Sequence, residues 1–217
     1  MVYTIQLKQT FDEMKKTVKE NILFNARLLF VEKGFKGTSI REIAQHSQVN
    51  ISAISYYFKG KKQLYFACME EFGEQYLELV KILDQPTLTE DSFKNSLENF
   101  LKGFLSRYYA NPELICLVLK EIEAQGFKNF VILETVFLKI YNDLVHFFQL
   151  AKNEHLIKAS LSEKILSQIF IGLILQAISF DKHRQQQLNV SLLHDQSYRE
   201  EYITNLLEIF IDGIEKK

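Results

Sequence analysis

Apolar residues recur every three to four positions along almost the whole chain, and this spacing limits the fold more than any other feature. The first clear set stops before Gly34 and lies on one face of a helix: Val18, Ile22, Ala26, Leu29 and Phe30. Only two prolines and eight glycines interrupt the 217 residues, so long helices are expected. No stretch of useful length alternates as a strand does. We therefore predict an all-α protein of about nine helices.

The same pattern predicts where the helices lie. Ser39 and Glu42 form a capping box for a short helix, residues 47–50 form a tight turn, and Ile51–Phe58 form a second short helix. A long helix is expected over 61–83, before a linker that contains Pro86. Further helices are predicted over 91–109, 112–125, 128–152, 162–180 and 198–215, with connectors over 153–161 and 181–196.

Composition narrows the class of protein. The N-terminal ten residues lack the apolar core of a signal peptide, and polar residues interrupt the most apolar run, 165–178, which is too short to span a membrane. Cys68 and Cys116 show no disulfide or metal spacing. We expect a cytoplasmic protein that has no metal, no cofactor and no association with a membrane.

Charge is distributed unevenly between the two ends of the chain. Residues 1–60 contain nine Lys and Arg against five Asp and Glu, whereas the remainder contains 17 against 22. This difference indicates that the first part meets a polyanion, although a difference of this size is also common on an ordinary solvated surface.

Two short helices joined by a tight turn behind a longer helix form a helix-turn-helix. Such a motif presents its second helix to the major groove of DNA. Val49, Ile54 and Phe58 are expected to anchor that helix inward. Residues 22–69 resemble the DNA-binding domain of the TetR family of bacterial repressors. The resemblance is carried by Ala26, Phe30, Gly34, Phe35, residues 38–44 and, above all, residues 49–65.

The resemblance implies a three-helix DNA-binding domain over 12–60 and a larger helical domain over 61–217 for ligand binding and dimerisation. It implies DNA contacts at the start of the second helix, around the recognition helix and at the start of the next helix. These residues are Thr38, Ser39, Arg41, Asn50, Ile51, Ser52, Ala53, Ser55, Tyr56, Tyr57 and Lys61.

Two positions depart from the family pattern. Gln48 occupies a turn position that is often Gly, and a positive φ there would cost about 1 kcal/mol or more. Ile51 occupies a position that is often polar or basic. The apolar spacing alone would turn Ile51 partly inward, whereas the resemblance leaves it near DNA, where it can meet a thymine methyl group.

The second part of the chain is expected to have an aromatic interior with a site for a small-molecule effector, although an aromatic stripe is more often plain core. The candidate effector residues are Phe100, Phe104, Tyr108, Leu117, Glu121, Phe137, Tyr141, Phe170 and Leu173. The last two helices carry more apolar surface than one core face needs, which predicts a dimer interface. Its candidate residues are Ile169, Leu173, Ala177, Leu206 and Phe210.

The expected function is that of a ligand-responsive transcriptional regulator. As a homodimeric repressor it would bind a near-palindromic operator in double-stranded DNA, and a small apolar or amphipathic effector would release it. A helical adaptor with degenerate DNA binding, or an activator, remains an alternative. The five histidines are scattered without metal spacing or a nucleophile motif, so no enzymatic activity is expected.

Overall fold

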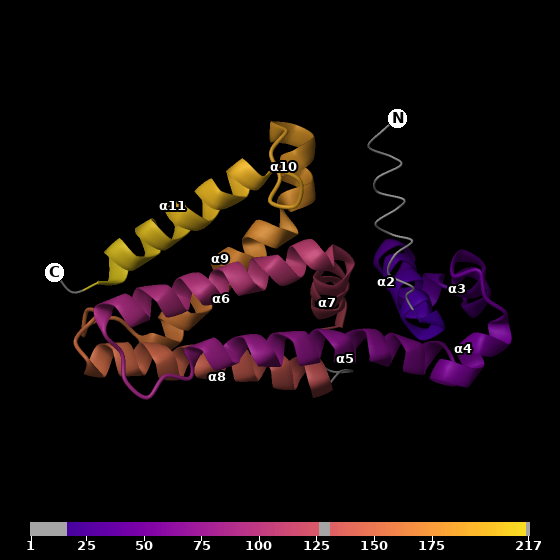
Figure 1. Ribbon diagram of the computed structural model, residues 1–217, viewed down its shortest axis with the longest axis horizontal. Coiled ribbons are helices and arrows are strands. Elements are labelled where there is room, and N and C mark those ends of the chain that lie inside the picture. The colour runs from indigo at the N-terminus through magenta and orange to yellow at the C-terminus, as the bar shows by residue number, and fades with distance from the viewer. Residues whose placement is uncertain (1–16, 126–130, 216–217) are drawn as a thin grey trace. The chain divides into compact units, whose positions relative to one another are not determined.

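A computed structural model describes residues 17–125 and 131–215 of the chain (Figure 1). These residues form ten α-helices and one short 3-10 helix, and they contain no strand. A single antiparallel bridge joins Ile157 to Glu215. The predicted all-α fold is confirmed, with ten helices where about nine were expected.

The chain divides into two compact units, and the division lies between Cys68 and Met69. This division falls inside α5 (Lys61–Val80), so one continuous helix contributes its start to the first unit and its remainder to the second. The domain limits expected from the sequence, 12–60 and 61–217, stay a prediction, because compactness does not measure which segment folds on its own.

The first unit consists of α2 (Val18–Gly37), α3 (Ile40–His46), α4 (Ile51–Phe58) and the start of α5. Thr17 and Glu20 form a capping box at the start of α2, and its helical geometry breaks at Gly34, where φ is 69°. Glycine adopts this left-handed backbone without steric cost. Four of the five predicted apolar residues of α2 are buried, whereas Val18 is exposed. The buried core of this unit consists of Ile22, Ala26, Leu29, Phe30, Ile43, Ala44, Ile54, Phe58 and Leu64.

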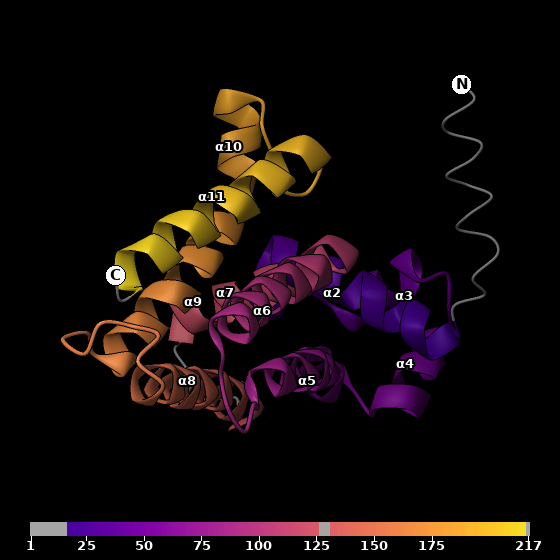
Figure 2. The same cartoon turned by 60° about the vertical axis from the view of Figure 1, so that its left-hand side comes forward.

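The second unit contains the rest of α5 and seven further elements (Figure 2). In chain order these are η1 (Lys81–Leu83), α6 (Glu90–Ala110), α7 (Pro112–Gln125), α8 (Val131–Asn153), α9 (Glu163–Ser179), α10 (Asp181–Leu188) and α11 (Gln196–Ile214). α8 packs along α9, and α6 packs against η1, α7 and α11. The helix predicted over 61–83 corresponds to α5 followed by η1.

Aromatic rings fill the interior of the second unit. The Phe93 ring stacks on that of Phe147, with 5.5 Å between the centroids. The Phe170 ring lies 6.1 Å from that of Phe100 and 5.0 Å from that of Phe210. Large rings at these separations bury much apolar area and attract one another. Among the described residues of this unit, eight phenylalanines are buried: Phe72, Phe93, Phe100, Phe104, Phe147, Phe148, Phe170 and Phe210.

The sequence prediction was wrong at α10, which lies inside the connector expected over 181–196. Its sequence, DKHRQQQL, has no apolar face, so the spacing of apolar residues cannot reveal it. Its first residue, Asp181, is buried and accepts hydrogen bonds from the Tyr108 hydroxyl at 3.1 Å and the Ser191 hydroxyl at 2.9 Å. Buried polar contacts rather than an apolar face hold this helix.

Within residues 17–125 and 131–215, no single helix combines the length and the apolar composition needed to cross a membrane. The helices α9 and α10 pass that test only when they are taken together, across a bend of 52°.

Candidate nucleic-acid interface

The start of α3 is fixed by a capping box. The Ser39 backbone N–H donates to the Glu42 carboxylate at 2.9 Å, and the Glu42 N–H donates to the Ser39 hydroxyl oxygen at 3.2 Å. The pKa of Glu42 is lowered to about 2, first by a hydrogen bond from Lys33 and then by the bonds from Ser39. Because this pKa is lowered from 4.5, the cap contributes fully above pH 4.5 and is lost as the pH falls through about 2.

The prediction for Thr38 needs a correction. Its side chain is buried, and its hydroxyl donates to the carbonyl oxygens of Leu29 at 3.1 Å and Gly34 at 2.9 Å. A hydroxyl held in this way is directed at the end of α2 rather than at solvent. Thr38 therefore positions the start of α3, and its side chain is not available to a phosphate.

Two hydrogen bonds hold the turn between α3 and α4. The Val49 N–H donates to the Ala44 carbonyl at 3.0 Å, and the Asn21 side-chain amide of α2 donates to the Ser47 carbonyl at 2.7 Å. Gln48 has a φ of 54°, the left-handed conformation that its place in the motif suggested. A residue with a Cβ is strained at such a φ.

Replacing Gln48 by glycine is expected to raise the free energy of unfolding by about 1 kcal/mol, because glycine adopts a positive φ without strain. Urea unfolding followed by far-UV circular dichroism measures this. The matched control is Gln45→Gly, which lies in the regular backbone of α3 and is expected to destabilise by about 1 kcal/mol. Destabilisation of both variants would contradict the strain argument.

α4 is anchored by apolar side chains on its inward side. Ile54 and Phe58 are buried, and Val49 is half-buried, so the predicted anchors are confirmed. At the start of the helix, the Asn50 side-chain oxygen accepts from the Ser52 N–H at 3.0 Å and from the Ser52 hydroxyl at 3.1 Å. The helix ends at Lys59, which has a φ of 59°.

Three large side chains of α4 are exposed to solvent. The exposed fraction is 43% for Ile51, 81% for Tyr56 and 41% for Tyr57. The rings of Tyr56 and Tyr57 meet edge to face, with 5.0 Å between the centroids. These three side chains are not part of the core. The surface that they form is therefore available to a partner.

Lys61 joins the first turn of α5 to the start of α3. Its ammonium group donates to the Thr38 carbonyl at 2.7 Å and lies 4.4 Å from the centre of the Phe35 ring. Lys61 is half-buried, whereas Ser39, Arg41, Asn50, Ser52 and Ser55 are exposed and Ala53 is half-buried. The structure thus brings all of the predicted DNA-contact residues into the first unit. Whether they touch DNA stays a prediction.

Comparison with known proteins agrees with this arrangement. The sequence profile of the bacterial regulatory proteins of the tetR family matches residues 22–68, which contain α3, the turn and α4. Residues 22–68 are therefore similar to the tetR family of bacterial regulatory proteins. YttP of Bacillus subtilis (strain 168), a probable HTH-type transcriptional regulator, is 37% identical over 109 residues. That match covers 50% of this chain and 52% of YttP, so the chain spans about half the length of this curated relative.

Solved structures extend the similarity of fold over nearly the whole chain. The ketosteroid transcriptional regulator KstR2 of Mycobacterium tuberculosis matches with a TM-score of 0.73 at 12% identity, over 93% of this chain and 97% of KstR2. AibR, in its complex with isovaleryl coenzyme A and operator DNA, matches with a TM-score of 0.69 at 17% identity, over 89% of this chain and 97% of AibR. At these identities the likeness concerns the fold alone.

The predicted effector residues are mostly packed into the core of the second unit. Phe100, Phe104, Tyr108, Leu117 and Phe170 are buried. Phe137 and Tyr141 are half-buried, Leu173 is exposed, and the Glu121 side chain lies outside the described part of the structure. Burial fits plain core as well as a closed site, so the effector role of these residues stays a prediction.

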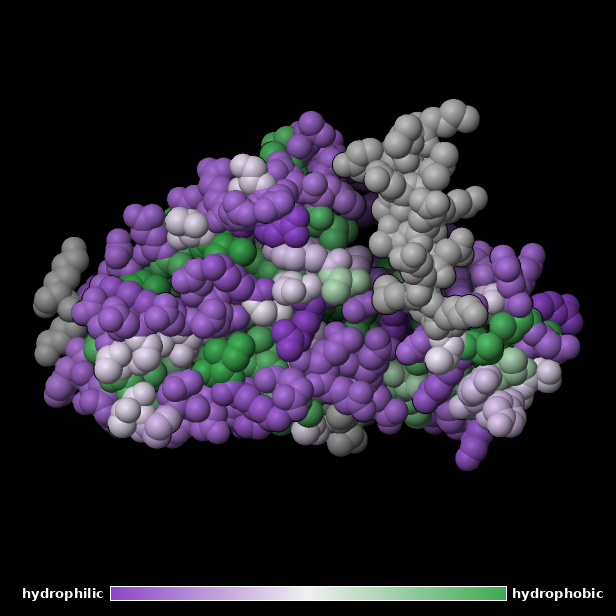
Figure 3. Space-filling model, viewed as in Figure 1, coloured by the Kyte–Doolittle hydropathy of each residue, from purple (hydrophilic) through white to green (hydrophobic). Residues whose placement is uncertain are grey.

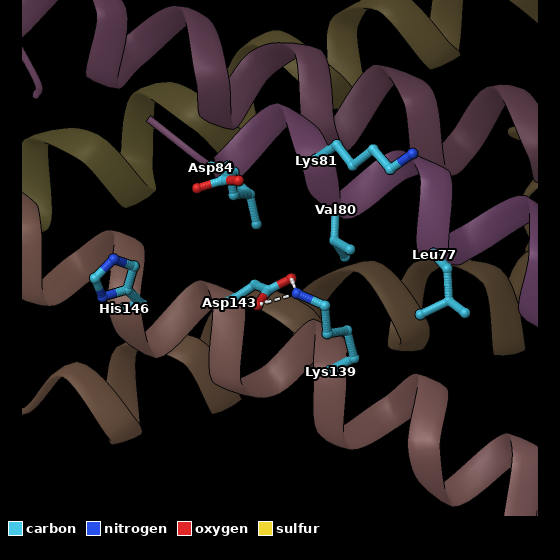
Figure 4. Close-up of a pocket in the computed structure, with 8 residues that line it drawn as sticks. Leu77, Val80, Lys81, Asp84, Lys139, Asp143 and His146 are labelled. Carbon is cyan, nitrogen blue, oxygen red and sulfur yellow. Dashed lines mark hydrogen bonds and ion pairs between the residues drawn. The ribbon is translucent and has the colours of Figure 1, made fainter. Parts of the chain in front are cut away.

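A hollow of about 440 Å³ lies between the end of α5, η1 and α8 (Figure 4). Leu77 and Val80 project toward α8, where Lys139 forms an ion pair of 2.6 Å with Asp143. Its lining residues do not include any of the predicted effector residues. Apolar side chains of α5 and η1 line this hollow together with charged side chains from both sides, among them Lys81, Asp84 and Lys139.

An apolar groove of about 510 Å³ runs between α9 and α11. It contains four of the five predicted dimer residues: Ile169, Leu173, Leu206 and Phe210. Ala177 was wrongly placed in this group, because its side chain is completely buried within its own chain. Ile209, which was not among the five candidate residues, lines the groove and is highly exposed. Apolar surface shows in strips between hydrophilic residues elsewhere on the second unit (Figure 3).

Proposed function

We propose that this protein is a transcriptional repressor whose homodimer binds a near-palindromic operator through α4. The observation that carries the proposal is the structure of the first unit. A short helix, anchored by Ile54 and Phe58, presents exposed side chains beside the exposed Arg41 and the half-buried Lys61. This is the arrangement by which a recognition helix enters the major groove.

The proposed contacts divide by chemistry. Ser39, Arg41, Tyr56, Tyr57 and Lys61 contact phosphates, because hydroxyl groups and cations bind the DNA backbone without reading its sequence. The residues nearest the start of α4 contact base edges: Asn50, Ile51, Ser52, Ala53 and Ser55.

A homodimer provides two recognition helices. A dimer with twofold symmetry reads two half-sites about one turn of DNA apart, which accounts for a near-palindromic operator. The groove between α9 and α11 supports this part of the proposal, because exposed Ile169 and Leu173 lie on its surface. A second copy of the same groove is an apolar partner of matching chemistry.

An effector is proposed to act through the second unit. AibR is described with isovaleryl coenzyme A and operator DNA, and KstR2 is named a ketosteroid regulator; both share this fold. We propose a small apolar or amphipathic effector for the present chain, which must bind the released state more tightly than the DNA-bound state. α5 runs without interruption from Lys61 to Val80 and so connects the two units covalently. The proposed activity is binding without chemical conversion, in the cytoplasm.

Selection from a pool of random-sequence duplexes tests the DNA-binding claim with the full-length protein. The expected result is one near-palindromic sequence, bound at moderate salt and released more readily as salt rises. Recovery of no preferred sequence would favour a helical adaptor with degenerate DNA binding. Raised rather than lowered transcription from a promoter carrying the site would identify an activator.

Replacing both Tyr56 and Tyr57 by alanine is expected to weaken operator binding about 30-fold or more, because four hydrogen bonds per dimer, each worth about 0.5–1.5 kcal/mol, are lost. Both rings are exposed, so the unfolding temperature is expected to stay nearly constant. Fluorescence anisotropy with the selected duplex measures the affinity. Leu138→Ala, an exposed position in α8, is the control and should bind as the unchanged protein does. Equal affinity of all three proteins would refute the assignment of these contacts.

A further inference from the structure

The outward surface of α4 carries no charged side chain. The helix has the sequence ISAISYYF, so neither arginine nor lysine is available within it to bind guanine, and no carboxylate is available to bind cytosine. The cations of this part of the unit lie outside the helix, at Arg41, Lys59, Lys61 and Lys62. Phosphate binding and base reading are therefore assigned to different side chains.

The polar groups at the start of α4 are already engaged. The Asn50 side-chain oxygen accepts two hydrogen bonds from Ser52, at 3.0 Å and 3.1 Å, and these bonds cap the helix. A base that recruited the Ser52 hydroxyl would have to compete with this cap. Ile51, the first residue of the helix, has no polar side-chain group that could join this cap, and 43% of its surface is exposed to solvent.

We propose that Ile51 determines operator specificity by packing against the 5-methyl group of a thymine in each half-site. The inference rests on the proposed function and adds the base that the site selects. Among the bases of unmodified DNA, thymine alone presents a methyl group in the major groove, and apolar side chains contact it. Residues at the N-terminal end of a recognition helix are those that reach base edges.

The side chain of Ile51 is well suited to this task. A β-branched residue in a helix populates one χ1 rotamer strongly, so little side-chain freedom is lost when it contacts a methyl group. Burial of one methyl-sized group is worth about 0.8 kcal/mol, which corresponds to about fourfold in affinity. With two half-sites, the thymine methyl groups together contribute about 15-fold.

The test uses the full-length protein and the duplex recovered by selection. The thymines at each symmetry-related pair of positions are replaced together by 2′-deoxyuridine, which removes the methyl groups and keeps the base pairs, and affinity is measured by fluorescence anisotropy. At one symmetry-related pair of positions, the substitution is expected to weaken binding about 15-fold. The variant Ile51→Ala is expected to bind the thymine and uracil duplexes equally.

Leu28→Ala is the matched control, because Leu28 in α2 is exposed by the same 43% as Ile51. This variant should keep the full preference for thymine over uracil. The inference is overturned if no thymine position responds to loss of the methyl group, or if Ile51→Ala keeps the preference. Selection of a site together with either of these results leaves the proposed function intact. Failure to select any site overturns both.

Discussion

Replacing Ile169 and Leu173 together by glutamate is expected to convert the proposed homodimer into monomers and to abolish operator binding at physiological salt. Both side chains line the groove between α9 and α11, and both are exposed in the isolated chain. A carboxylate buried without a partner costs several kcal/mol, and a symmetric dimer would bury four. We expect the dimer dissociation constant to rise at least about 1000-fold.

Sedimentation velocity over a range of protein concentrations measures the loss of the dimer, and the unfolding temperature shows whether the monomer keeps its fold. Leu138→Glu is the control, since Leu138 is 51% exposed in α8, against 48% for Ile169 in the groove. This control should remain dimeric and bind its operator normally. A folded double variant that sediments as a dimer would show that the interface lies on another surface.

Replacing Asp181 by alanine is expected to lower the free energy of unfolding of the second unit by about 3–5 kcal/mol. The carboxylate also accepts from the backbone N–H groups of Leu192 at 2.6 Å and Leu193 at 3.2 Å, and it pairs with Arg184 at 3.3 Å. Its removal takes the acceptor from the buried Leu192 N–H and from the buried Tyr108 hydroxyl, which costs more than the bonds themselves contribute.

The hydroxyl of Tyr108 is one of the donors to Asp181. Burial, and then the charge of Asp181, raises the pKa of Tyr108 far above the ordinary range of a tyrosine. The hydroxyl therefore keeps its proton at every physiological pH and donates a hydrogen bond to the carboxylate. Asp181 thus connects α6 to α10 and to the segment before α11 through bonds that alanine cannot replace.

Urea unfolding followed by circular dichroism measures the effect, because the chain contains no tryptophan for fluorescence. Asp195→Ala is the matched control. Asp195 caps α11 by accepting from the Tyr198 N–H at 3.0 Å and is half-buried, so its loss is expected to cost about 1 kcal/mol. The role given to Asp181 would be wrong if its alanine variant lost no more stability than this control.

The helices that the sequence predicted well are those with an apolar face. In the first unit, local signals also agree with one another: Ser39 and Glu42 form the expected capping box, and Gly34 breaks α2 where a helix end was expected. α10 was missed because its stability comes from Asp181, whose hydroxyl donors Ser191 and Tyr108 lie 10 and 73 residues away in the sequence. Contacts of that kind leave no local pattern.

In the candidate site, too, features set by local helical spacing were predictable and features set by long-range packing were not. Exposure of Tyr56 and burial of Ile54 follow from their places on one helix, and both were predictable. Thr38 and Ala177 were misplaced because burial depends on which element packs over a position, and helical spacing alone does not determine this. The groove residue Ile209 was overlooked as a candidate, although it belongs to the same apolar stripe of α11 as Leu206 and Phe210.

The central claim is sequence-specific DNA binding by α4, and the most direct test compares two dissociation constants. The full-length protein is titrated at physiological salt with the selected duplex and with a scrambled duplex of the same composition. We expect the selected duplex to bind at least about 1000-fold more tightly, the difference typical of specific recognition. Equal affinity for the two duplexes would contradict the claim.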